Sequence, residues 1–177
     1  DPARVAGKAV DMVAVLAEKK NLRLRAETSG LPAACLGDPT RITQVLLNLL
    51  SNAIKFTEAG EVALRAGSSD GTLFFRVSDT GIGMTREALN RLFQPFEQAE
   101  KGTSRKYGGT GLGLSISHRL ASLMGGSLSA ESTPGSGSAF TLQVPLLETK
   151  ESVADHAAIM VAGTQKRLIG LCILVAE

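Results

Sequence analysis

The sequence predicts an α+β fold, a two-layer α/β sandwich in which about three helices cover one mixed, mostly antiparallel sheet of five strands. Segments with apolar residues at helical spacing are interleaved with shorter segments in which apolar and polar residues alternate. Several of the alternating segments follow one another directly, with turn residues between them. Antiparallel strands can be joined in this way, whereas parallel strands need a long crossover. The sequence therefore disfavours a doubly wound parallel sheet.

The first half of the chain contains two predicted helices with a short strand between them. In residues 4–20, apolar side chains recur at near-helical spacing, and alternation predicts a strand near residues 22–27. The second helix extends from Asp38 to about Phe56, because Asp38 is a favourable N-cap and Pro39 suits the first helical position.

The second half supplies the remaining strands, two of them in a hairpin. Asp70 and Gly71 are hairpin turn residues between alternating segments at residues 61–66 and 72–78. The further elements are a short helix near residues 85–92, a helix at about 111–124 that ends at Gly125 and Gly126, a strand near Leu128 and a last strand through Phe140 and Val144.

The chain divides into three predicted parts. Residues 1–147 form the folded domain just described. Periodicity fades in residues 148–167, where Glu, Lys, Ser, Asp and Ala dominate, and this composition predicts a linker. Residues 168–177 begin with the apolar run LIGLCILV, which suits the buried parallel strand of a further, truncated domain.

Charge and hydropathy exclude several classes of function. The net charge is +2, and the 19 basic and 17 acidic residues are interspersed, so no surface for nucleic acid is predicted. No apolar run approaches the roughly 20 residues that span a bilayer, so we expect no membrane contact by this chain. The two cysteines lie far apart without further metal ligands nearby, which favours the reducing cytoplasm.

The predicted helix at residues 38–56 has a polar face that suits a metal ion and phosphates. Asn48 and Asn52 are one turn apart, and their amide oxygens can join waters and phosphates around Mg²⁺. Lys55 lies near the same face and can neutralise a phosphate. The alternative is an amphipathic helix whose Asn and Lys side chains face water.

Asp79 stands at the end of a predicted strand and is followed closely by Gly81 and Gly83. A carboxylate can accept a hydrogen bond from the exocyclic amine of adenine, and glycines allow a flat base to approach the backbone. These residues therefore suit an adenine site. The alternative is an ordinary Asp-Thr-Gly turn at a strand end.

A glycine-rich segment, GGTGLGLS at residues 108–115, opens the predicted helix at about 111–124. A helix N-terminus presents unpaired N–H groups and a positive dipole end, and glycines let a phosphate come close to both. The polar segment before it has the composition of a lid, whose Lys101, Arg105 and Lys106 could close on a polyphosphate. A flexible loop and a solvated charge cluster are the alternatives.

Four ordered motifs resemble the catalytic and ATP-binding domain of bacterial sensor histidine kinases, especially hybrid kinases. The motifs NLLSNAIKF at 48–56, DTGIGM at 79–84, LFQPFEQ at 92–98 and GGTGLGL at 108–114 are similar to that family's N box, first glycine box, F box and second glycine box. The resemblance covers about residues 4–147. It implies the Bergerat-type ATP-binding fold of the gyrase, MutL and histidine kinase ATPase superfamily.

The resemblance also implies ATP and Mg²⁺ as ligands. Asn48 and Asn52 would bind magnesium, Asn48 and Lys55 would act in catalysis, and Asp79 would bind the adenine amine. Further nucleotide contacts are implied at Gly81, Gly83, Arg105, Lys106, Tyr107, Gly109, Thr110, Gly111, Leu112 and Gly113. Asn48 stands where hydrolytic members have a water-activating glutamate, and an amide cannot accept that proton, which favours a kinase over an ATPase.

The implied activity is transfer of the ATP γ-phosphate to a histidine on a dimerisation domain that is absent from this chain. The implied parent is a homodimer, anchored in a membrane or not, whose partner is a response regulator or receiver domain. The segment LCILVAE at 171–177 is similar to the first strand of such a receiver domain. Two alternatives stay open, namely a nucleotide-sensing module without kinase activity and a hydrolytic member of the superfamily.

Overall fold

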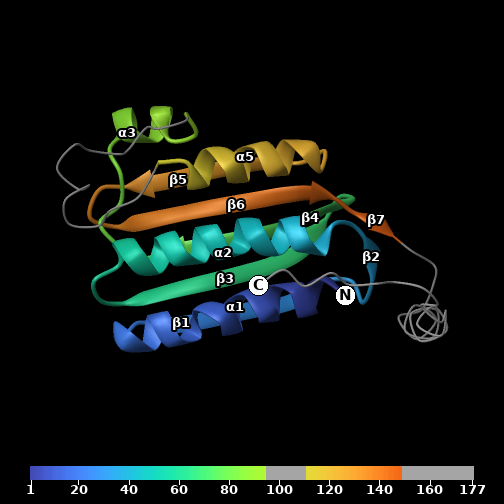
Figure 1. Ribbon diagram of the computed structural model, residues 1–177, viewed down its shortest axis with the longest axis horizontal. Helices are drawn as coiled ribbons and strands as arrows, with labels where there is room; N and C mark the ends of the chain where they lie inside the picture. Colours follow the sequence, from blue (N-terminus) through green and yellow to red (C-terminus); the bar gives the residue numbers. More distant parts are fainter. Residues whose placement is uncertain (95–110, 149–177) are drawn as a thin grey trace, which may run out of the picture.

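A mixed sheet of five strands carries its helices on one face (Figure 1). The computed structural model describes residues 1–94 and 111–148. In spatial order, the strands are β1 (Arg23–Gly30), β3 (Glu61–Ser69), β4 (Thr72–Asp79), β6 (Gly137–Pro145) and β5 (Ser127–Thr133). Within this sheet, β1 and β3 are parallel and the other neighbouring pairs are antiparallel, which confirms the predicted mixed sheet.

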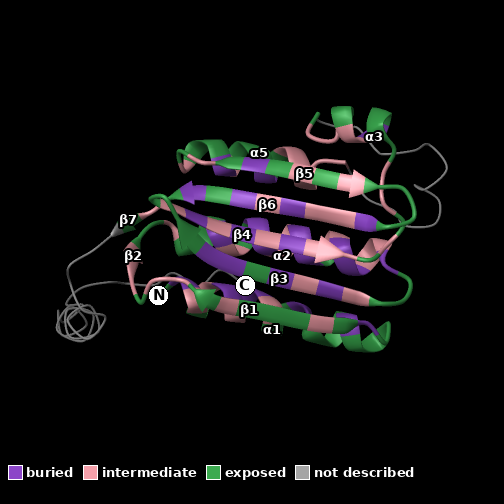
Figure 2. Cartoon of the chain, turned by 180° about the vertical axis from the view of Figure 1, so that it is seen from behind, coloured by how far each residue is buried: buried purple, intermediate pink, exposed green. Residues whose placement is uncertain are grey.

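Three of the described helices form the second layer. The helices are α1 (Pro2–Lys19), α2 (Pro39–Phe56), the short α3 (Arg86–Arg91) and α5 (Gly113–Leu123). Helix α2 lies between α1 and α5 over the sheet, while α3 lies beyond the edge strand β5 (Figure 1). Seen from behind, the opposite face of the sheet is not covered by these helices (Figure 2). The predicted two-layer sandwich is therefore confirmed.

The core lies between the sheet and the helix layer. Alternate residues of β3 and β4, such as Leu64 and Phe75, are almost fully buried in one cluster with Leu46 and Leu49 of α2. Because successive side chains of a strand point to opposite faces, the residues between them face the open side of the sheet. Burying large apolar side chains contributes roughly 1.5–3 kcal/mol each, so this alternation holds the two layers together.

Local sequence signals fix several ends of these elements as predicted. Oδ1 of Asp38 accepts hydrogen bonds from the N–H groups of Thr40 and Arg41, each at 3.0 Å, and so caps α2. In the hairpin between β3 and β4, Asp70 and Gly71 have φ angles of 50° and 71°, as a type I′ turn requires.

Two features differ from the prediction. Helix α5 begins at Gly113 rather than at about residue 111, because Gly111 has a φ angle of 70°, outside the right-handed helical region. A small second sheet was not predicted, in which β2 (Cys35–Leu36) pairs with β7 (Leu147–Glu148). Strands of two residues show no alternation that a sequence pattern could reveal.

The described helices include none with the length and hydropathy needed to cross a bilayer. Apart from residue 148, the predicted linker at 148–167 and the predicted strand at 168–177 lie outside the described residues. Both therefore stay predictions.

Candidate functional site

Three motif-bearing segments meet at one end of the domain. The C-terminal end of α2, the end of β4 and the start of α5 lie at the same end of the molecule (Figure 1). Two close approaches join them. A Cβ atom on Gly81, just after β4, would lie less than 3.0 Å from the carbonyl oxygen of Phe56, and one on Gly113 would lie equally close to Oδ1 of Asn48. The structure thus gathers the N box and parts of both glycine boxes.

Asn48 projects from α2 toward α5, and Asn52 lies one turn further along α2. Nδ2 of Asn48 donates a hydrogen bond to Oγ of Ser117 on α5, at 2.9 Å. Nδ2 of Asn52 lies 3.5 Å from Oδ1 of Asn48. Both asparagines are half-buried. Oδ1 of Asn48 is therefore the atom turned toward Gly113, at the first residue of α5.

The N-terminus of α5 is suited to an anion. The first N–H groups of an α-helix have no partner within the helix. At the N-cap position of α5 stands Leu112, whose side chain cannot accept a hydrogen bond from them. The helix dipole adds partial positive charge at this end, so phosphate oxygens are favoured here. The amide oxygen Oδ1 of Asn48 lies directly beside this helix end.

Asp79 is the last residue of β4, and alternation with the buried Val77 places its carboxylate on the helix-facing side. Oδ1 of Asp79 accepts hydrogen bonds from the N–H groups of Gly81 (2.8 Å) and Ser138 (3.3 Å). Partial burial raises the pKa of the Asp79 carboxyl above its usual value, and the two N–H groups oppose that shift. Since none of the described residues donates to Oδ2, this atom can accept from a ligand.

Gly81 and Gly83 lie against the protein's own backbone. Besides the approach of Gly81 to Phe56, a Cβ atom on Gly83 would overlap the carbonyl group of Thr133. Gly83 also has a φ angle of 65°, a conformation that side chains other than glycine rarely adopt. Packing alone therefore requires glycine at both positions. Their predicted contact with a base stays a prediction.

Lys55 lies in the last turn of α2, with its Nζ atom 4.9 Å from the centroid of the Phe56 ring. In this cation–π contact, the ammonium group lies near the C-terminal end of α2, which adjoins Gly81. Its predicted contact with a phosphate stays a prediction. Several other predicted nucleotide contacts lie outside the described residues: Arg105, Lys106, Tyr107, Gly109 and Thr110.

Two serines at this site were not among the predicted residues. Ser117, 2% exposed, accepts from Asn48 as described. Ser138 donates its N–H to Asp79, and its Oγ lies 3.0 Å from Oγ of Ser132, which belongs to the facing strand β5. Serine is common at surfaces and turns, so neither position stood out. The one available signal was that Ser117 lies one helical turn after Gly113.

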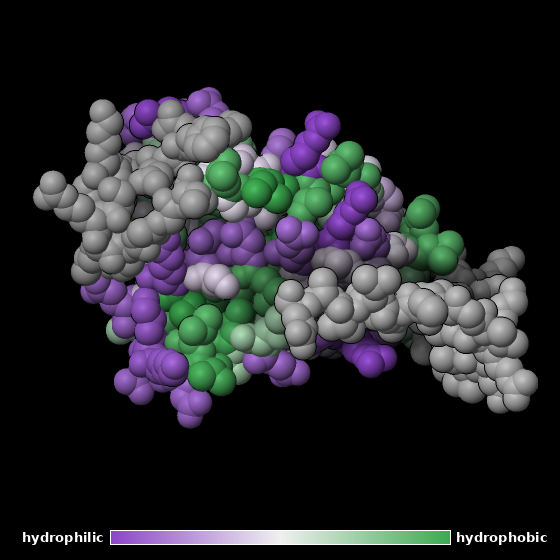
Figure 3. Space-filling view, in the orientation of Figure 1, coloured by the Kyte–Doolittle hydropathy of each residue, from purple (hydrophilic) through white to green (hydrophobic). Residues whose placement is uncertain are grey.

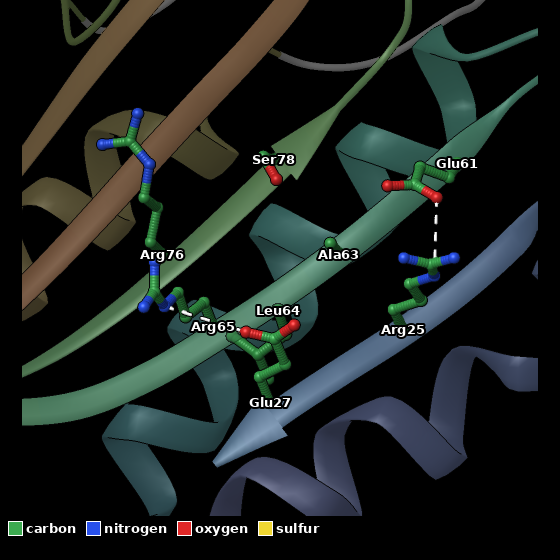
Figure 4. A pocket seen from close by; sticks show the side chains of 8 residues that line it. All are labelled: Arg25, Glu27, Glu61, Ala63, Leu64, Arg65, Arg76 and Ser78. Atoms are coloured by element: carbon green, nitrogen blue, oxygen red, sulfur yellow. Dashed lines mark ion pairs between the residues drawn. The ribbon is translucent and has the colours of Figure 1, made fainter. Parts of the chain in front are cut away.

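A cavity of about 250 Å³ lies elsewhere, on the open face of the sheet (Figure 4). Charged side chains from β1 and β3 line it and pair with one another, Arg25 with Glu61 at 3.6 Å and Arg65 with Glu27 at 3.8 Å. Ion pairs between solvent-exposed side chains contribute little stability. Because its charges are paired and its described lining residues include none of the glycine-rich motifs, we assign no ligand to this cavity.

The surface over α2 is mainly hydrophilic, whereas hydrophobic residues gather over parts of α1 and α5 (Figure 3). On α1, the side chains of Met12, Val15 and Leu16 are about half exposed. Helix α2 also carries the half-buried polar side chains of Asn48 and Asn52. A charged ligand is thus more compatible with α2 than with its neighbours.

Comparison with known proteins agrees with these observations. The family model described as histidine kinase-, DNA gyrase B- and HSP90-like ATPase matches residues 37–148. The sensor histidine kinase RcsC of Escherichia coli (strain K12) is 48% identical over 116 residues, which cover 66% of this chain and 12% of RcsC. The sensor protein TorS of the same organism is 46% identical over 147 residues, 83% of this chain and 15% of TorS. The chain therefore spans a small part of these relatives.

Solved structures share the fold. The crystal structure of full-length ShkA in complex with AMPPNP has a TM-score of 0.76 and 34% identity, over 84% of this chain and 31% of ShkA. The catalytic domain of histidine kinase ThkA has a TM-score of 0.70 and 27% identity, over 81% of this chain and 91% of that domain. These findings confirm the resemblance to histidine kinase catalytic domains. The chain belongs to the family of histidine kinase-, DNA gyrase B- and HSP90-like ATPases.

Proposed function

We propose that this chain is the ATP- and Mg²⁺-binding catalytic domain of a hybrid sensor histidine kinase. It transfers the γ-phosphate of ATP to a histidine on a dimerisation domain outside this chain. The observation that carries the proposal is the close approach of Asn48 to Gly113. It places an amide oxygen that can bind a cation beside the N-terminus of α5, where N–H groups can bind phosphate oxygens. The carboxylate of Asp79 near the same end of the domain supports adenine as the base.

The asparagine pair fits a magnesium ion that is shared with a nucleotide. Mg²⁺ prefers oxygen ligands, keeps several waters and is commonly bound together with substrate phosphates. Asn48 and Asn52 offer amide oxygens one turn apart, and residues 1–94 and 111–148 include no cluster of His, Cys, Asp and Glu that could hold a metal. The phosphates would supply the negative charge. When bound, Mg²⁺ neutralises charge that develops on the transferred phosphoryl group.

The chain's own residues bind and orient the nucleotide. Oδ2 of Asp79 accepts a hydrogen bond from the adenine amine, and the N–H groups at the start of α5 donate to phosphate oxygens. Lys55 adds a positive charge beside the phosphates. The amide of Asn48 cannot take a proton from water, which disfavours hydrolysis. A neutral imidazole attacks without such a base, so this site suits transfer to histidine.

The partners follow from this chemistry. The phosphate passes to a histidine of the dimerisation domain in a homodimeric parent, and then to a receiver domain or response regulator. Similarity to the sensor histidine kinase RcsC and to the sensor protein TorS supports this assignment. Because the domain consumes ATP, we place it in the cytoplasm. We propose no nucleic acid and no membrane as a partner of this chain.

The test mixes this chain with the parent's separately purified dimerisation domain and ATP labelled at the γ-phosphate. We expect acid-labile, base-stable label on the histidine of that domain. The chain alone should stay unlabelled, although it has two histidines. His118 packs against Phe93 with ring centroids 5.0 Å apart and lies more than one turn beyond the start of α5, and His156 belongs to the predicted linker, where its effective concentration at the site should be low. ATP binding without labelling would favour a nucleotide-sensing module. Multiple-turnover release of phosphate would favour a hydrolytic enzyme.

A further inference from the structure

We propose that Ser117 is a positioning residue that holds the Asn48 side chain with its oxygen toward the magnesium site. This inference rests on the proposed function, in which Asn48 is a magnesium ligand. Ser117 lies outside the four motifs, on the buried face of α5, and its Oγ accepts a hydrogen bond from Nδ2 of Asn48 at 2.9 Å. Its role would be to select one of two orientations of the amide.

A side-chain amide has two orientations with opposite chemistry. Rotation by half a turn exchanges Oδ1, which can bind a cation, for Nδ2, which can only donate hydrogen bonds. In the observed orientation, Nδ2 of Asn48 points to Ser117, and Oδ1 faces Nδ2 of Asn52 at 3.5 Å. The reversed orientation would set the two NH₂ groups of Asn48 and Asn52 against each other. Both contacts therefore favour the oxygen-outward orientation.

The burial of Ser117 makes this preference strong. Ser117 is 2% exposed, so the side of the Asn48 amide that faces its hydroxyl is turned away from bulk water. A buried donor without an acceptor is unfavourable. In a Ser117→Ala variant, the amide of Asn48 gains by turning Nδ2 outward, which places a donor where the cation would lie. Residues that orient a metal ligand typically change metal affinity about 10–100-fold when replaced.

A purely structural role makes a different prediction. Ser117 also packs α5 against α2, and loosening this contact would displace the whole helix end at Gly113. Nucleotide affinity would then fall equally with and without magnesium. Loss of orientation alone affects only the part of the affinity that depends on magnesium.

The experiment is calorimetry with ATP on the full 177-residue chain, once with Mg²⁺ and once with EDTA. In Ser117→Ala, the ratio of the two affinities should fall about tenfold relative to wild type, because the orientation of a metal ligand is lost. The affinity in EDTA should stay within about twofold of wild type, since the phosphate and base contacts are intact. The control is Ser122→Ala on the exposed side of α5, where Oγ donates to the carbonyl oxygen of His118 at 3.0 Å. An unchanged ratio, or an equal fall in both conditions, would overturn the proposal.

A spectroscopic readout needs no nucleotide. The side-chain NH₂ signal of Asn48, assigned by its loss in Asn48→Ala, should exchange slowly with water in wild type and faster in Ser117→Ala. Unchanged exchange would contradict the hydrogen bond as the source of the orientation.

The two proposals fail separately. A wild-type chain that does not bind ATP refutes the proposed function, whereas normal ATP binding with an unchanged affinity ratio in Ser117→Ala refutes only the role of Ser117.

Discussion

Replacing Asp79 with asparagine should separate nucleotide binding from folding. Asparagine retains Oδ1, so the hydrogen bonds from the N–H groups of Gly81 and Ser138 can persist. It replaces Oδ2 with an NH₂ group, which would face the donating amine of adenine. Loss of a hydrogen bond to a charged acceptor costs about 1.5–3 kcal/mol, which corresponds to about 10–150-fold in Kd for ATP.

The same substitution should raise the free energy of unfolding at neutral pH. Burial raises the pKa of Asp79 in the folded state, so the folded chain binds this proton more tightly than the unfolded chain. Wild type therefore loses stability as the pH rises from the unfolded pKa through the folded pKa. Asparagine does not ionise. The stability advantage of Asp79→Asn should grow across that window and stay constant above it.

Calorimetry with ATP and Mg²⁺ measures the first effect, and urea unfolding at several pH values measures the second. The matched control is Asp70→Asn, which changes the same charge in the exposed hairpin turn between β3 and β4. This control should bind ATP like wild type. Wild-type affinity in Asp79→Asn, or an equal loss in the control, would refute recognition of adenine by Asp79. A stability difference that is independent of pH would refute the effect of burial.

Two further substitutions test the packing of the site. Gly113→Ala should weaken ATP binding and lower the free energy of unfolding by about 1 kcal/mol, because its Cβ would push the Asn48 amide away from its hydrogen bond with Ser117. Gly7→Ala, with nothing within 4 Å of its Cβ, should instead stabilise α1 by about 0.5–1 kcal/mol. Equal effects in urea unfolding would contradict this contact. Lys20→Met should cost about 1 kcal/mol, because Nζ of this exposed lysine donates to three carbonyl oxygens at the end of α2, 2.8–3.2 Å away. The neighbouring Lys19→Met should leave the urea midpoint nearly unchanged, and similar losses in both would argue against the capping contact.

Local rules predicted most of the fold from the sequence. The cap at Asp38, the turn at Asp70 and Gly71 and the helix end at Gly125 depend on backbone conformations that a few neighbouring residues determine. Alternation in β3 and β4 likewise reflects burial of every second side chain. These features could be predicted because each is complete within a short segment.

Features that depend on distant segments could not be predicted in this way. Ser117 bonds to Asn48 across 69 residues, and this contact exists only because α5 packs against α2. The packing reason for glycine at Gly83 is the backbone of Thr133, a neighbour in space that no local pattern reveals. The motifs therefore predicted site residues, whereas the structure shows which distant neighbours hold Asn48 and Gly83 in place.

The most direct test of the proposed function is a crystal structure of this chain with Mg²⁺ and a non-hydrolysable ATP analogue. We expect the adenine amine at Oδ2 of Asp79, the metal at the amide oxygens of Asn48 and Asn52, and the phosphates at the start of α5. A nucleotide bound instead in the charged cavity on the open face of the sheet, or one whose base does not contact Asp79, would contradict this assignment.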